Sequence, residues 1–203
     1  MRRRGKKTTT AGRRLHEVAA PQSAVELRII AGSWRGRRWR FPAIAGVRPT
    51  PNRVRETLFN WLAPRILGAR CLDLCAGSGA LGLEALSRGA AQVIFVDQQR
   101  EAVRSLESLL KDWQGTNYQI HCSDAADWLS RVSGLRFDIV FLDPPFSADL
   151  VPKLLARLRT SGCLAPAAWI YLEQPATLAP PADWHVHRSG RAGAVGYYLL
   201  HEA

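Results

Sequence analysis

The 203-residue sequence lacks any apolar run near the roughly 18 residues that a membrane-spanning helix needs. No apolar stretch follows the basic residues that end at Arg14, so no signal peptide is expected. The four cysteines form no C-x-x-C pair. Cys71 and Cys75 lie in one expected strand, roughly 13 Å apart at Cα, which is too far for a disulfide. These absences indicate a reduced, cytoplasmic protein.

Acidic residues are scarce in the first quarter of the chain, which explains the net charge of +11. Residues 1–14 hold seven bases and residues 28–55 hold eight, and neither segment has an acid. Residues 56–203 are slightly acidic, with 13 bases and 15 acids. The 47% apolar and 22% charged content is typical of a globular protein and excludes disorder of the whole chain. The basic segments make nucleic acid the first candidate partner.

The pattern divides the chain into three parts: a disordered basic tail (1–24), a basic segment of hairpin and helix (25–64), and an α/β domain (65–203). In the second part, apolar alternation over 27–31 and 39–41 predicts a β-hairpin whose tip, 33–38, is basic. Thr50 and Pro51 then predict the cap and first position of a helix that runs to about Ala63.

From residue 70, short apolar strands alternate with helical segments. The expected strands are 71–75, 93–97, 118–122, 137–142 and 169–173, and the expected helices are 80–87, 100–113, 125–132 and 148–160. This alternation predicts an α/β fold with a parallel sheet and helices on both faces. The runs 184–188 and 195–201 are joined by only a short glycine-containing turn, so we expect an antiparallel hairpin at the sheet edge.

Gly77, Gly79 and Gly82 satisfy G-x-G-x-x-G between a strand and a helix. Such a loop suits a dinucleotide or S-adenosylmethionine. Asp73 lies close to it, where a carboxylate would repel a pyrophosphate but suits a cofactor that bears an ammonium and a sulfonium. Further carboxylates, Asp97 and Asp124, follow the next two strands, where they are suited to ribose hydroxyls and to a base's amino group. A plain glycine turn with surface carboxylates is the structural alternative.

The most specific motif is Asp143-Pro144-Pro145-Phe146, directly after an apolar strand. Two prolines fix a rigid loop at the carboxyl edge of the sheet. Asp143 and the carbonyls of the Pro144–Pro145 stretch suit the two N–H groups of a planar exocyclic amine, and Phe146 suits stacking on an extruded base. The structural alternative is a turn in which the aspartate caps the next helix and Phe146 packs in the core.

Together, segments 28–37, 48–50, 53–62, 76–88 and 143–146 resemble the bacterial 16S rRNA guanine(966)-N2 methyltransferase family. The resemblance covers about residues 26–201. It implies a class I S-adenosylmethionine-dependent methyltransferase fold (Rossmann-like) with a seven-stranded, mostly parallel sheet. It also implies a target guanine in the assembled small ribosomal subunit. Asp97 is a departure, since relatives often have the longer Glu there, and the basic tail is longer than expected.

The resemblance implies that residues 25–64 bind RNA and cover the cofactor and that residues 65–203 form the methyltransferase domain. It assigns the catalytic loop to Asp143, Pro144, Pro145 and Phe146. The expected cofactor site comprises Asp73, Ala76, Gly77, Gly79, Asp97, Gln98, Asp124, Ala125, Asp143 and Thr50. The expected RNA surface comprises Trp34, Arg35, Arg37, Arg38, Arg48, Arg53 and Arg55. No metal site is expected, because His185 and His187 have no evident third ligand.

The leading hypothesis is therefore transfer of a methyl group from S-adenosylmethionine to a guanine N2 of 16S rRNA in the small (30S) subunit, by a monomer. Two alternatives remain open from the residues. The same loop geometry serves a DNA adenine-N6 methyltransferase. A non-catalytic RNA-binding assembly factor with a relic pocket is the other, although the intact carboxylates argue against it.

Overall fold

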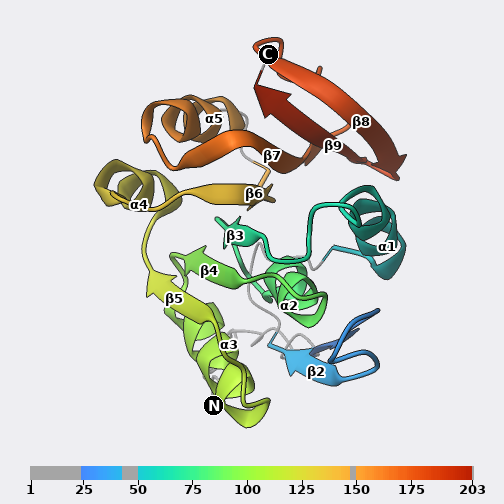
Figure 1. Ribbon diagram of the computed structural model, residues 1–203. Coiled ribbons are helices and arrows are strands. Elements are labelled where there is room, and N and C mark those ends of the chain that lie inside the picture. Colours follow the sequence, from blue (N-terminus) through green and yellow to red (C-terminus); the bar gives the residue numbers. More distant parts are fainter. Residues whose placement is uncertain (1–23, 43–49, 147–149, 203) are drawn as a thin grey trace, which may run out of the picture.

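The computed structural model describes residues 24–42, 50–146 and 150–202. A seven-stranded sheet forms its centre, in the order β5-β4-β3-β6-β7-β9-β8 (Figure 1). The first five strands are parallel: β3 (Arg70–Asp73), β4 (Gln92–Asp97), β5 (Tyr118–Cys122), β6 (Phe137–Leu142) and β7 (Leu164–Pro175). The predicted alternation is confirmed. β7 begins earlier than expected, and β3 ends at Asp73 because the chain there turns into the glycine loop.

Helices cover both faces of the sheet, as predicted (Figure 1). They are α2 (Ala80–Ser87), α3 (Arg100–Asp112), α4 (Ala125–Arg131) and α5 (Leu150–Thr160). α2 and α3 share one apolar core with one face, and α4 and α5 share a second core with the other. This doubly wound arrangement brings the loops after the parallel strands to one edge, where open α/β sheets bind ligands.

The C-terminal hairpin of β8 (Trp184–Ala192) and β9 (Val195–Glu202) is antiparallel, as expected. β9 inserts between β7 and β8 and pairs antiparallel with β7. The sheet is thus mostly parallel and ends in β8. None of the helices in the described ranges is long and apolar enough to cross a membrane.

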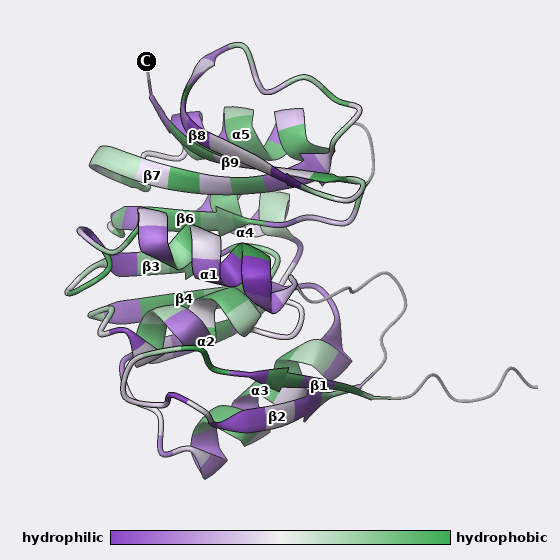
Figure 2. Cartoon of the chain, turned by 90° about the vertical axis from the view of Figure 1, so that its right-hand side faces the viewer, coloured by the Kyte–Doolittle hydropathy of each residue, from purple (hydrophilic) through white to green (hydrophobic). Residues whose placement is uncertain are grey.

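The N-terminal hairpin consists of β1 (Val25–Arg28) and β2 (Arg38–Phe41), and it is followed by α1 (Asn52–Trp61). Figure 2 shows the hairpin lying beside α2 and α3, at the end of the molecule opposite β8 and β9. Trp39 and Phe41 bury their side chains in the core that also contains α2 and α3. Residues 1–23 of the expected tail and Arg48 lie outside the described residues.

The predicted start and end of the α1 helix were wrong. Pro51, not Thr50, precedes its first residue, with no side-chain cap, and the helix stops at Trp61 rather than Ala63. The Thr50 hydroxyl does not cap the helix because it donates instead to Asp143, 93 residues away. Thr50 therefore ties the start of α1 to the loop after β6.

Candidate active site

The glycine loop between β3 and α2 is held by carboxylates from two neighbouring strands. Asp73 Oδ2 accepts the Gly82 N–H at 2.9 Å, and Asp97 Oδ2 accepts the Gly77 N–H at 2.7 Å. Gly79 has φ +73°, which glycine adopts at little cost. A Cβ on Gly82 would lie 2.1 Å from the Phe95 ring, so this position brings α2 close to β4. The loop backbone is therefore fixed by side chains at the carboxyl edge of the sheet.

Asp73 lies almost fully buried beneath the loop. Burial raises its pKa to about 7, and the nearby Asp97 carboxylate adds to that rise, while the Gly82 hydrogen bond lowers the pKa. A carboxylate in such a place is costly without a positive partner. The site therefore favours a cationic ligand over an anionic one.

The residues after β4 and β5 lie at the same edge. Asp97 Oδ1 also accepts the Gln99 N–H at 2.7 Å, beside the exposed Gln98. Asp124 caps α4: its Oδ1 accepts the N–H groups of Ala126 at 2.8 Å and Asp127 at 3.0 Å. The Asp124 Oδ2 atom takes no part in this cap. Two further predicted residues lie in these loops, Ala76 (buried) and Ala125 (half-buried).

The loop after β6 carries the Asp143-Pro144-Pro145-Phe146 motif. Asp143 Oδ2 accepts the Thr50 hydroxyl at 3.3 Å. Burial raises the pKa of the Asp143 carboxyl well above its ordinary value, and the Glu173 and Asp73 carboxylates raise it further. Pro145 is exposed and the Phe146 residue is 54% exposed, so Phe146 does not pack in the core. The loop thus presents an aromatic ring to solvent beside a half-buried carboxyl.

Sequence reasoning missed Glu173, the last carboxyl at this edge. It lies near the end of β7, next to β6, and is 4% exposed. Its Oε1 accepts the Tyr171 hydroxyl at 2.7 Å. A carboxylate that closes an apolar strand is the same signal that identified Asp97, so the pattern contained this residue.

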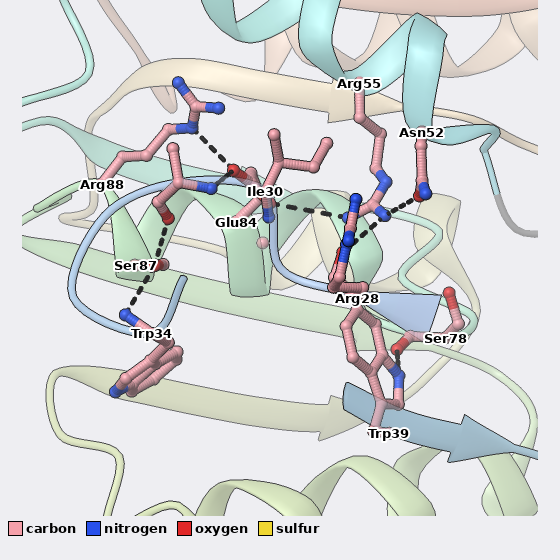
Figure 3. A network of polar contacts seen from close by, with 12 residues as sticks. Arg28, Ile30, Trp34, Trp39, Asn52, Arg55, Ser78, Glu84, Ser87 and Arg88 are labelled. Carbon is pink, nitrogen blue, oxygen red and sulfur yellow. Dashed lines mark hydrogen bonds and ion pairs between the residues drawn. The ribbon is translucent and has the colours of Figure 1, made fainter. Parts of the chain in front are cut away.

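Arg55 was predicted to bind RNA, and the structure contradicts this. Its side chain is fully buried, and its guanidinium donates to the Arg28 carbonyl at 2.8 Å and to Asn52 Oδ1 at 2.6 Å (Figure 3). Its Nη1 lies 3.6 Å from Glu84 Oε2, an ion pair too long to be a hydrogen bond. Burial lowers the pKa of Arg55, while the Glu84 charge opposes that shift. Arg55 is a core residue that joins α1 to α2 and β1.

Glu84 is the centre of this contact and was also missed. It is fully buried in α2, seven of whose eight residues are buried. Its carboxylate accepts the Ile30 N–H at 2.8 Å, the Ala31 N–H at 3.0 Å and Arg88 Nε at 2.8 Å (Figure 3). A charged residue inside an apolar helix needs such partners, so the presence of Glu84 in the apolar α2 was the sequence signal for this cluster. Glu84 and the groups it contacts are called the Glu84 cluster below.

The basic tip of the hairpin lies away from Asp143. Ser33 and Trp34 bond through their N–H groups to Ser87, at the C-terminal end of α2, whereas the glycine loop precedes the first residue of α2. About 12 Å of helix therefore separates the tip from the glycine loop. The tip arginines are exposed: Arg35, Arg37 and Arg38. Their expected grip on RNA around the target stays a prediction.

The other predicted RNA residues divide between surface and core. Arg53 is exposed on α1. Trp34 is half-buried and packs edge-on against Trp113, with 5.4 Å between the two ring centroids. Trp39, also in the hairpin, is buried and donates from Nε1 to the Ser78 carbonyl at 3.3 Å. An open groove of about 240 Å³ beside the tip is lined by Arg28, Ile29, Ile30, Arg35, Gly36 and Glu56.

His185 and His187 gain a neighbour that the sequence did not suggest. The ring centroid of His201, from β9, lies 4.5 Å from that of His185. Within the described residues, no group of three or more His, Cys, Asp or Glu side chains is arranged to hold a metal ion.

Comparison with known proteins agrees with this geometry. A family model described as Conserved hypothetical protein 95 matches residues 27–201. The Ribosomal RNA small subunit methyltransferase D of Escherichia coli K12 is 45% identical over 177 residues, covering 86% of this chain and 89% of that protein. Its Haemophilus influenzae counterpart is 38% identical over 190 residues, covering 91% and 98%. The chain belongs to the ribosomal RNA small subunit methyltransferase D family. The family predicted from the motifs is confirmed, and the chain is a methyltransferase.

Solved structures place the family in the class I methyltransferase fold. The Escherichia coli protein yhhF has a TM-score of 0.79 and 44% identity, covering 88% of this chain and 98% of that one. A Thermus thermophilus 16S rRNA N2 G1207 methyltransferase, solved with AdoMet and guanosine, has a TM-score of 0.67 at 21% identity. It covers 89% of this chain and 50% of its own, and at this identity the likeness concerns the fold alone.

Proposed function

We propose that this methyltransferase transfers the methyl group of S-adenosylmethionine to the exocyclic N2 of a guanine in 16S rRNA, acting as a monomer on the 30S subunit. The observation that carries the proposal is the placement of Asp143. This carboxyl follows β6, beside the glycine loop and next to an exposed phenylalanine. The relatives reported above are named Ribosomal RNA small subunit methyltransferase D, a name that gives small-subunit ribosomal RNA as their substrate.

S-adenosylmethionine is the cofactor, and the residues present fit it. The buried Asp73, whose pKa is raised to about 7, suits a ligand with an ammonium and a sulfonium. Asp97 has lone pairs left for ribose hydroxyls, and the Asp124 Oδ2 atom is available to an adenine amino group. When bound, the cofactor supplies an electrophilic methyl group. The backbone and side chains of Ala76, Gly77, Gly79, Gln98 and Ala125 would line its site.

The loop residues orient a weak nucleophile. The lone pair of an aromatic amine is delocalised into its ring, so the amine reacts only when it is held in a favourable geometry. Asp143 accepts one N–H, and the backbone carbonyls of the Pro144–Pro145 stretch accept the other, which aims the nitrogen lone pair at the methyl group. Phe146 stacks on the extruded base. The ionised Asp143 carboxylate also receives the proton that the amine releases.

The RNA surface that we propose follows the hairpin and α1. The exposed arginines at its tip, with Arg53 on α1, supply phosphate contacts. Because the tip lies about a helix length from the glycine loop, these contacts reach RNA beyond the target nucleotide. Recognition of structure around the target, as in an assembled subunit, fits this separation. Arg55 is not part of this surface.

The test uses labelled S-adenosylmethionine and 30S subunits from a strain that lacks this methylation. Wild-type protein should label one guanine of 16S rRNA at N2, as mapped by nuclease digestion and mass spectrometry. Asp143→Asn should lose at least about a hundredfold in rate, the size expected for one catalytic hydrogen-bonding group, while calorimetry still detects cofactor binding. The matched control is Asp138→Asn, at the opposite end of the same strand, where the carboxylate pairs with Arg70.

Three outcomes would overturn the proposal. Faster methylation of duplex DNA than of subunits would indicate an adenine-N6 enzyme. No cofactor binding would indicate a non-catalytic RNA-binding protein. An Asp143→Asn variant that keeps most of the activity would remove Asp143 from the reaction.

A further inference from the structure

Glu173 and Asp143 occupy adjacent positions on neighbouring strands. β6 and β7 pair in parallel with Leu142 opposite Leu172, and each carboxyl residue follows directly after this pair. Asp143 and Glu173 therefore meet at the edge where the target amine is presented. Glu173 is 4% exposed, so water screens its charge only weakly. The mechanism above does not use this second carboxyl.

A single hydroxyl lies between the two carboxyls. Thr50 donates to Asp143 Oδ2 at 3.3 Å, and the same hydroxyl lowers the pKa of Glu173. It has one proton, so it can donate to only one of them at a time. Tyr171 donates to Glu173 at 2.7 Å, which gives Glu173 a donor that Asp143 lacks. A buried and a half-buried carboxyl that share a donor in this way hold a proton between them, and Glu173 is better placed to remain charged.

We propose that Glu173 is a positioning residue that sets the protonation state of Asp143 and thereby the pH at which methyl transfer begins. The inference rests on the proposed function, because it assigns Asp143 the acceptor role there. The ionised Asp143 accepts an amine N–H more strongly than the protonated form does, and only the ionised form can take up the proton that the amine releases. A charged Glu173 beside it opposes that ionisation, so the free site keeps a proton.

The direction of the pKa shifts agrees with this geometry. Burial raises the pKa of Asp143 well above its ordinary value, and Glu173 is the largest charge that adds to the rise. The pKa of Glu173 is also raised by burial, but the Tyr171 and Thr50 hydroxyls lower it. The other titratable groups that face the pair are Asp73 from β3, Cys75 from the loop after it, Tyr171 from β7 and Tyr197 from β9.

A purely structural role for Glu173 makes a different prediction. Glutamine keeps the oxygen that accepts the Tyr171 hydroxyl but removes the charge. If Glu173 only fills space and accepts that bond, Glu173→Gln leaves the titration of Asp143 unchanged. If its charge matters, Glu173→Gln lowers the pKa of Asp143, while Glu173→Asp, which keeps the charge, leaves that pKa near its wild-type value.

The first measurement needs neither cofactor nor RNA. Carboxyl carbons of ¹³C-labelled aspartate are titrated by NMR in the free protein, and Asp143 is assigned with Asp143→Asn. The Asp143 midpoint should fall by about one pH unit or more in Glu173→Gln, as expected for loss of a buried like charge. An unchanged midpoint would overturn the inference.

The second measurement is the pH dependence of the methylation rate on 30S subunits. The acid limb should move to lower pH in Glu173→Gln, by the same amount, so that the rate on that limb rises about tenfold. Glu173→Asp should follow the wild-type limb. A Glu173→Gln enzyme that is slower at every pH with an unmoved limb would indicate a structural role and refute the inference.

Two controls separate the possible failures. If Glu173→Gln does not fold, Tyr171→Phe tests the inference instead. This substitution removes a hydrogen-bond donor from the Glu173 carboxylate, so the shared proton moves toward Glu173. The acid limb of the methylation rate should then again shift to lower pH. An acid limb at the wild-type pH in Tyr171→Phe contradicts the inference. If Asp143 titrates as expected but no RNA is methylated, the proposed function fails while the coupling of the two carboxyls stands.

Discussion

The Glu84 cluster predicts that Glu84 and Arg55 respond unequally to substitution. Glu84 accepts hydrogen bonds from Ile30, Ala31 and Arg88 in addition to its 3.6 Å ion pair with Arg55. Removing Arg55 therefore leaves the Glu84 charge with three donors. Removing the Glu84 charge leaves the buried guanidinium of Arg55 with only neutral oxygens, from the Arg28 carbonyl and Asn52.

The expected magnitudes follow from this asymmetry. Glu84→Gln should destabilise the protein by about 3–5 kcal/mol, the cost of an uncompensated buried charge. Arg55→Met fills the same space with an apolar chain, and its main cost is the lost partners of two oxygens, about 1–3 kcal/mol. The double variant should cost less than the sum, because it removes both charges. Arg53→Met, on the exposed face of the same helix, should stay within about 0.5 kcal/mol.

Urea unfolding at neutral pH measures these differences. With a slope of about 2 kcal/mol per molar urea, the midpoint should fall by roughly 1.5–2.5 M in Glu84→Gln and by less in Arg55→Met. If Arg55→Met is the more destabilising of the two, or if the double variant costs the full sum, the charge argument is wrong. An Arg55→Met protein that binds RNA with a reduced salt dependence would show that Arg55 reaches the surface after all.

Two further predictions concern Asp73 and the hairpin tip. The pKa of Asp73 is raised to about 7 in the folded protein from an ordinary 3.8, so the unfolded state loses this proton first and the free protein loses stability as the pH rises from about 4 to about 7. Asp73→Asn should flatten that slope in urea titrations, and an unaltered slope would place the raised pKa elsewhere. Joint replacement of Arg35, Arg37 and Arg38 by Ala should lower the slope of log affinity for 30S RNA against log salt by roughly one per lost phosphate contact. Identical salt slopes for variant and wild type would show that the RNA lies elsewhere.

Much of the fold follows from local patterns in the sequence. Residues 137–142 are a mostly apolar run, apolar and polar residues alternate over 118–122, and the structure has strands at these bounds. The glycine loop and Asp143 follow strands directly, so their positions at the sheet edge depend only on strand direction. Such features need no knowledge of which strands are neighbours.

Two features that the sequence did not predict depend on contacts between distant segments. Glu173 meets Asp143 only because β6 and β7 pair in one register, which joins positions 30 residues apart. The tip of the hairpin bonds to Ser87, which places it at the C-terminal end of α2. No local pattern specifies either pairing.

Arg55 shows how a count of charges can mislead. Its eight-arginine segment suggested a surface for RNA, yet Arg55 lies at helical spacing with Leu58, Phe59 and Leu62, all of which are buried. A base on the apolar face of a helix implies a buried acid, and Glu84, an acid inside the apolar α2, is its counterpart. Considering these two charged residues on apolar helix faces together would have predicted the ion pair between Arg55 and Glu84.

This pairing links the N-terminal hairpin, the proposed RNA surface, to the loop that carries Asp143. The Glu84 cluster fixes the hairpin backbone at Ile30 and Ala31 and holds the first turn of α1 through Arg55. Thr50 lies two residues before α1, and its hydroxyl contacts Asp143. A shift of the hairpin on RNA would therefore have to move α1, and with it the hydroxyl that Asp143 and Glu173 share. Rigid support of this kind would hold the proposed catalytic carboxyl in register with RNA bound at the proposed hairpin surface.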